Sequence, residues 1–242
     1  MPWDFWLIFL VLGLLLPWRG FERMRQLMLL PEVTARDRIR LYLLTMLFQW
    51  VLTLAVAWRA LARGLSLEEL AVRGGSRPRI LAASVIGAGL VAVAHWANLK
   101  RMSRSDHPNL ERLRALGSRL FPRTAGETAL FVLLALTAGL CEEFLFRGFI
   151  MAALLRFGAA TWLAVLISAA MFGVAHLYQG KGGSIGTGIL GTLFALARIA
   201  YHSLVPAVVW HTALDVVAGI AGAKFLVNAS AGESKVLEEI HR

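Results

Sequence analysis

The amino-acid sequence predicts an all-α fold, a polytopic transmembrane bundle of about seven helices (six to eight) that encloses a polar cavity. Three observations lead to this fold class. Hydrophobic residues make up 58% of the 242 residues, and the mean hydropathy is +0.65. The apolar residues gather into long runs, and the charged residues lie mostly between these runs. Three short clusters of ionisable residues nevertheless lie inside the runs, where such groups usually face a cavity and pair with one another.

Seven apolar runs are expected to be the membrane-spanning helices. They cover residues 3–18, 41–57, 80–98, 126–158, 160–178, 185–200 and 204–227. The first run has no basic segment before it and no small-residue cleavage site after it, so we expect a retained helix rather than a signal peptide. The chain is therefore expected to be an integral, multi-pass membrane protein, in the cell membrane if it is bacterial.

The basic residues bear on the orientation in the membrane and on the partners. The formal net charge is +10, with six arginines in residues 19–40 and seven basic residues in residues 100–123. An excess of arginine and lysine in short loops marks the cytoplasmic face, and we expect an external N-terminus and an internal C-terminus. Because the basic loops fall on both sides, they favour contact with anionic membrane lipids over nucleic acid.

The distribution of the motifs divides the chain into three expected parts. These are N-terminal transmembrane helices with basic loops over residues 1–125, a helical core that carries the three ionisable clusters over 126–227, and a polar C-terminal tail over 228–242. The single cysteine, Cys141, excludes an internal disulfide and a cysteine-based zinc site. We expect it to be a packing residue rather than a nucleophile.

The fourth and fifth runs meet at a turn near Gly158, which predicts an antiparallel helical hairpin. Glu142 lies about 16 residues before this turn and His176 about 17 after it, so at about 1.5 Å per residue both stand roughly 25 Å from the turn. A carboxylate and an imidazole are therefore expected to face each other. His211 lies closer to the start of its own helix, so we expect the 126–158 helix to be overlong or tilted.

Spacing along each helix assigns further neighbours. Glu143 and Arg147 are four residues apart and share a face, which predicts an ion pair that chiefly braces the helices. Glu142 is turned away from that pair and is expected to face a cavity and handle protons. Phe172 shares the face of His176 and either walls the site or packs as an ordinary aromatic residue.

His211 and Asp215 repeat the four-residue spacing on the last helix. The Asp215 carboxylate is expected to accept a proton from one imidazole nitrogen and leave the other nitrogen for chemistry.

Several other residues receive structural interpretations. The glycine-rich stretch 180–188 lacks the features of a phosphate-binding loop and is expected to be a flexible loop between helices. Gly186, Gly188 and Gly191 predict close packing of the sixth helix. The remaining histidines are interpreted as packing or interfacial residues; they are His95, His107, His202 and His241.

The three clusters resemble the CAAX-processing and bacteriocin-processing (CPBP, or Abi) intramembrane proteases, which include the Rce1-type prenyl endopeptidases. That family carries Glu-Glu-x-x-x-Arg, Phe-x-x-x-His and His-x-x-x-Asn/Asp in this order on successive hydrophobic helices. The matching residues here are Glu142, Glu143 and Arg147, then Phe172 and His176, then His211 and Asp215. The similarity extends over roughly residues 126–219 and includes none of the first three helices.

The resemblance implies an intramembrane endopeptidase, a hydrolase in which Glu142 and His176 activate water and His211 with Asp215 stabilises the oxyanion. Glu143 and Arg147 complete the candidate catalytic residues. An ionised aspartate, unlike asparagine, cannot donate to an oxyanion. His211 is therefore given the direct role and Asp215 the orienting role, unless Asp215 stays protonated.

Metal dependence is left with two alternatives. Glu142, His176 and His211 match the ligand set of some catalytic zinc sites. The sequence lacks His-Glu-x-x-His, the most diagnostic zinc-protease arrangement, so we expect no cofactor, with one zinc ion as the alternative.

The expected partners are membrane lipids and a peptide or lipidated protein substrate, whose identity the sequence leaves open. Two other functions remain as alternatives. One is a non-enzymatic membrane scaffold or bacteriocin self-immunity protein, and the other is a transporter with a Glu/His proton relay.

Overall fold

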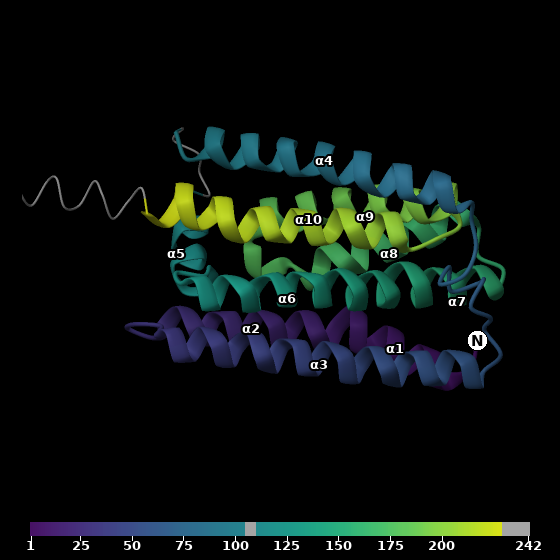
Figure 1. The fold of residues 1–242 in the computed structure, drawn as a ribbon. Coiled ribbons are helices and arrows are strands. Elements are labelled where there is room, and N and C mark those ends of the chain that lie inside the picture. Colours follow the sequence, from purple (N-terminus) through teal and green to yellow (C-terminus); the bar gives the residue numbers. More distant parts are fainter. Residues whose placement is uncertain (105–109, 229–242) are drawn as a thin grey trace, which may run out of the picture.

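A computed structural model describes residues 1–104 and 110–228 of the chain. The described residues form helices and no strands (Figure 1), which confirms the all-α fold class. The interpretations of His107 and His241 lie outside the described residues, as does the expected C-terminal tail apart from its first residue.

Six helical stretches of the described chain are long and apolar enough to cross a membrane. They are α1 to α2 (Trp3–Leu29), α3 (Ala35–Ala62), α4 (Arg77–Met102), α6 to α7 (Ala125–Arg156), α9 (Lys181–Tyr201) and α10 with its continuation (Val205–Val227). A shorter apolar helix, α8 (Thr161–Ala175), has 15 residues, and the amphipathic α5 (Leu110–Leu120) lies at one end of the bundle (Figure 1). Counting α8, the described chain has the seven hydrophobic segments expected.

Three of the long stretches contain a π-helical segment, which in α10 is the continuation Ala223–Asn228 and in the other two lies between α-helices. One lies between α1 (Trp3–Leu10) and α2 (Leu16–Leu29), and the other, Phe144–Ile150, lies between α6 (Ala125–Glu143) and α7 (Met151–Arg156). The expected overlong fourth helix is confirmed, because α6 to α7 spans 32 residues and about 20 residues suffice to cross a bilayer. Figure 1 shows α7 extending beyond the start of α10.

The first helix is longer than the sequence indicated. It continues to Leu29, so part of the basic segment 19–40 is helix rather than loop. The residues of α2 are mostly good helix formers, and Arg25 pairs with Glu22 three residues before it, at 2.9 Å, which supports the helix locally.

The prediction of a flexible loop over residues 180–188 is wrong for most of that stretch. Only residues 176–180 form the turn, where Gly180 has a φ of 89°, and α9 starts at Lys181. The Ser184 hydroxyl donates to the Gly173 carbonyl at 2.7 Å, and a Cβ on Gly173 would lie 2.9 Å from the Ser184 carbonyl oxygen. This close approach of α8 and α9 requires glycine and stabilises residues 181–188 as helix.

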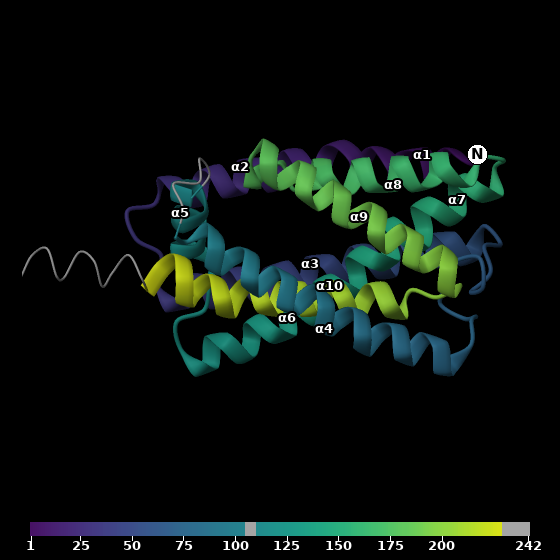
Figure 2. The ribbon, with the colours of Figure 1, turned by 90° about the horizontal axis from the view of Figure 1, so that it is seen from above.

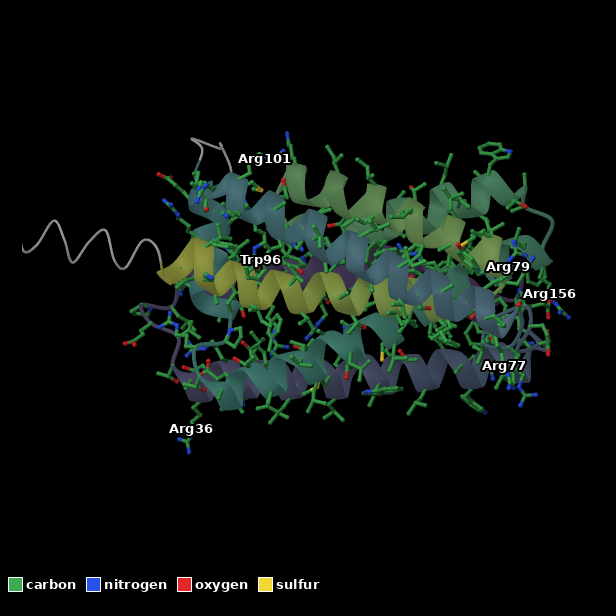
Figure 3. All side chains as sticks on the ribbon, turned by 45° about the horizontal axis from the view of Figure 1, so that its top comes forward. Arg36, Arg77, Arg79, Trp96, Arg101 and Arg156 are labelled. Carbon is green, nitrogen blue, oxygen red and sulfur yellow. The ribbon has the colours of Figure 1, made fainter. Side chains whose placement is uncertain are left out.

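Basic side chains lie at both ends of the bundle. Figure 3 shows Arg36 and Arg101 at one end and Arg77, Arg79 and Arg156 at the other. The N-terminus and the described end of α10 lie at opposite ends (Figure 1), as an odd number of crossings requires.

The largest apolar core joins the first helices to α6 and α7. Phe5 and Leu12 of the first stretch pack in one cluster with Phe149 and Ile150, and the rings of Phe5 and Phe149 meet edge to face with centroids 5.0 Å apart. Leu70, in the loop between α3 and α4, is buried in the same cluster. On the other side, α9 runs obliquely from the end of α8 to the start of α10 (Figure 2).

Candidate active site

Three segments of the bundle carry the predicted site residues. Glu142 and Glu143 end α6, Arg147 lies in the following π-helical turn, and His211 and Asp215 lie on α10. His176 follows the last residue of α8. π-Helical turns are frequent at functional sites, and this one follows directly on the two glutamates.

The predicted pair of Glu143 and Arg147 is present and is the innermost part of the site. Arg147 Nη1 donates to Glu143 Oε1 at 2.9 Å, and both side chains are completely buried. The Arg147 guanidinium also lies over the Phe172 ring, 4.1 Å from its centroid, which is a favourable place for a desolvated cation. These contacts agree with the predicted brace.

Glu143 also holds His211, which differs from the sequence interpretation. Nδ1 of His211 lies 2.8 Å from Glu143 Oε1, and because a carboxylate accepts hydrogen bonds, this nitrogen carries the hydrogen. Asp215 was expected to fill this position. Its Oδ2 instead lies 3.6 Å from Nε2, the other ring nitrogen. The carboxylate that sets the orientation of His211 thus comes from α6 rather than from its own helix.

Glu142 points toward α3 and α10. Its Oε1 accepts a hydrogen bond of 2.8 Å from the Gln49 side-chain amide, and its Oε2 lies 3.9 Å from His211 Nε2. The Glu142 side chain is 21% exposed. Gln49 was missed in the sequence, although a glutamine in the middle of the apolar run 41–57 was the available signal.

His176 is oriented by its own helix. Its Nδ1 lies 2.8 Å from the Phe172 carbonyl oxygen, and because that oxygen can only accept, Nε2 of the neutral imidazole is left as an acceptor. The Phe172 ring lies beside both imidazoles, with centroids 4.7 Å from His176 and 5.7 Å from His211. No hydrogen bond or ion pair joins His176 to Glu142, so the expected face-to-face contact is not made directly.

A cavity of about 490 Å³ reaches the site. His176, His211 and Asp215 line it at the site, while most of its other wall is apolar and extends to Leu116 in α5. Glu142 is not among the lining residues, which differs from the expectation that it faces a cavity. The hydrogen bond from Gln49 holds Oε1 on the side of α3, and Oε2 is the oxygen that lies toward the cavity-lining His211.

The donor atoms do not form a metal site. Among residues 1–104 and 110–228, no group of three or more histidine, cysteine, aspartate and glutamate side chains could hold a metal ion. His211 Nδ1 is engaged by Glu143, and no hydrogen bond or ion pair joins His176 to Glu142. The residues therefore do not fit the zinc alternative in this arrangement.

The other interpreted residues lie away from the reacting groups or serve packing. Cys141 is a completely buried free thiol. His95, on α4, lines the apolar cavity, and His202 ends α9 in a left-handed conformation with a φ of 48°. Gly191 makes the close contact predicted for it, whereas a Cβ added to Gly186 would have no heavy atom within 4 Å.

Residues 124–217 match the family model described as type II CAAX prenyl endopeptidase Rce1-like. The matched segment contains all six predicted site residues and agrees with the range of the resemblance seen in the sequence. Over this segment the chain is therefore similar to the type II CAAX prenyl endopeptidases, and its candidate membrane spans make it an integral multi-pass membrane protein. Comparisons with curated proteins and with solved structures gave no match.

Proposed function

We propose that this protein is an intramembrane endopeptidase that hydrolyses a peptide bond of a lipidated, membrane-associated substrate with a water activated by Glu142 and His176. The observation that carries the proposal is the meeting of Glu142 and Asp215 at one nitrogen of His211, with His176 on the same cavity. Ionisable groups gathered inside a membrane bundle mark a functional site. The Rce1-like match supplies the general class.

The first step is attack of water on the peptide carbonyl. Glu142 Oε2, the oxygen not held by Gln49, accepts a proton from the water, while Nε2 of His176 accepts a hydrogen bond from the same water. The water oxygen forms a bond to the carbonyl carbon, and the electron pair of the C=O bond moves to the oxygen. General base catalysis of this kind contributes about 10²- to 10⁴-fold in rate.

His211 is assigned to the oxyanion. Because its Nδ1 hydrogen is directed to Glu143, Nε2 can donate only when the ring is an imidazolium. Glu143 at 2.8 Å and Asp215 at 3.6 Å both favour that cation. A donor aimed at the developing oxyanion is strengthened where water is scarce.

The second step breaks the peptide bond. The C–N bond cleaves as the oxyanion collapses, and the proton held by Glu142 passes to the leaving amine nitrogen. The products are a carboxylic acid and an amine, so one water is consumed for each peptide bond.

The apolar part of the cavity is assigned to the substrate. Its wall includes Leu116, Leu134 and Leu190 as well as the histidines, and these apolar side chains suit a hydrocarbon chain. A lipidated peptide would thus present its scissile bond at the polar end of the cavity.

The test is turnover of a lipidated reporter peptide by the purified protein in detergent or proteoliposomes. Glu142→Gln and His176→Ala should abolish turnover while the melting temperature stays close to wild type, and Glu22→Gln, a surface glutamate, should leave turnover unchanged. Full turnover by Glu142→Gln would refute the proposal. A scaffold or self-immunity protein would keep its cellular phenotype in that variant, and a transporter would show flux driven by a pH gradient.

A further inference from the structure

Gln49 is a polar residue in the middle of α3, where its neighbours along the helix are mostly apolar. Its neighbours Leu47 and Val51 are 61% and 59% exposed, as expected of side chains that face lipid. Gln49 is turned inward and half-buried, toward α6. A polar side chain in a membrane span is costly unless it finds a partner, and its partner here is Glu142.

The contact makes the two oxygens of the Glu142 carboxylate unequal. Oε1 accepts the Gln49 amide hydrogen at 2.8 Å, whereas Oε2 lies 3.9 Å from His211 Nε2. We propose that Gln49 is a positioning residue that holds Oε1 and thereby presents Oε2 as the oxygen that takes the proton from water. This inference rests on the proposed function and extends the site beyond the matched segment 124–217.

The rest of the Gln49 amide is not used to build the fold. Its Oε1 is buried and accepts no hydrogen bond from the described residues. A buried acceptor without a partner lowers stability, so the glutamine is a poor choice for packing alone. The one hydrogen bond that its side chain makes within the described chain is the one to Glu142.

The two helices are also held together elsewhere. Near the other end of the interface, Arg38 of α3 forms a buried ion pair of 3.0 Å with Glu127 of α6, and the Tyr42 ring of α3 meets the Phe131 ring of α6 edge to face, with centroids 5.6 Å apart. With these contacts, α3 does not need Gln49 in order to stay against α6. The geometry therefore indicates that the Gln49 side chain positions the Glu142 carboxylate and is not needed to hold α3 against α6.

The experiment compares kcat and KM of Gln49 variants on the lipidated reporter peptide. Gln49→Met keeps the approximate size and removes the donor, and should lower kcat by roughly 10²-fold, the effect of misplacing a reacting group, with little change in KM. Gln49→His restores an N–H at similar reach and should recover part of the loss. Thr53→Val is the matched control, since Thr53 is buried one turn further along α3 and makes no hydrogen bond to Glu142.

The outcomes separate this inference from the proposed function. A wild-type kcat in Gln49→Met, or a changed KM with unchanged kcat, overturns the role of Gln49 while Glu142→Gln still reports on the protease. Melting temperatures identify a variant that loses activity through unfolding. If Gln49→Met does not fold, Gln49→His and Gln49→Asn take its place: higher kcat in the histidine variant supports the role, and equal kcat in both overturns it.

Discussion

The buried ion pair of Glu143 and Arg147 offers a sharp test of how the site is held together. Replacing Arg147 by Met removes the cation and leaves the completely buried Glu143 with His211 Nδ1 as its remaining partner. Breaking a buried pair in this way costs about 3–5 kcal/mol. The loss of the stacked guanidinium over Phe172, at 4.1 Å, acts in the same direction.

The assay is reversible unfolding in mixed micelles. Arg147→Met should be destabilised by about 3–5 kcal/mol. The double variant Glu143→Gln/Arg147→Met should be more stable than Arg147→Met alone, because the buried Glu143 charge is removed with its cation while the amide oxygen can still accept from His211 Nδ1. Arg25→Met is the matched control, since it breaks a glutamate–arginine pair of the same 2.9 Å distance on the surface and should change stability little. An Arg147→Met variant within about 1 kcal/mol of wild type, or strictly additive effects, would refute the reasoning.

Four further predictions follow from separate parts of the structure. Gly191→Ala should lower the melting temperature and turnover, because its Cβ would lie 2.7 Å from Arg147 Nη2, and overpacking costs about 1–3 kcal/mol. Glu69, in the loop between α3 and α4, has its pKa lowered from 4.5 by the backbone N–H of Ser66 and by Arg156. The stabilisation that the ionised Glu69 provides should therefore be present at neutral pH and fade as the pH falls below about 4. The measurement is the difference in melting temperature between wild type and Glu69→Gln as a function of pH. Turnover should persist after treatment with a metal chelator, measured on the reporter peptide. The end of the bundle that bears Arg36 and Arg101 should be cytoplasmic and the N-terminus external, measured by labelling of single introduced cysteines in a Cys141→Ala background.

For each of these four predictions, one experimental result would contradict it. Gly186→Ala lies on the same helix with open space around it, so equal damage by both alanines would remove the steric explanation. A Glu69 effect that grows on acidification has the wrong sign. If the chelator abolished turnover and added zinc restored it, the site would be a zinc site. Labelling of the Arg36 end from outside intact cells would reverse the orientation.

The parts of the site that the sequence predicted are those fixed by spacing within one helix. Glu143 and Arg147 meet because four residues make about one helical turn, and this holds even though the π-helical turn starts between them. The length of α6 to α7 followed from the apolar run alone. These expectations needed no knowledge of which helices are neighbours.

The parts that the sequence missed depend on packing between helices. His211 pairs with Glu143 rather than Asp215 because α6 lies against α10, and Gln49 reaches Glu142 because α3 lies against α6. The glycine-rich stretch 180–188 carried loop-like composition, but close contact with α8 makes it helical. Local pattern could not show these contacts, since each joins residues far apart in the chain.

The edge-to-face contact of Phe5 with Phe149 has a practical consequence for protein engineering. A chimera that transplants only residues 124–217 into a foreign scaffold would leave the Phe149 ring without Phe5 and Phe9 and would leave Glu142 without its amide donor. Chimeras that exchange specificity between relatives should therefore include the N-terminal helices as well as the three motifs. The segment 124–217 that matches the family model is shorter than the part of the chain that packs around the site.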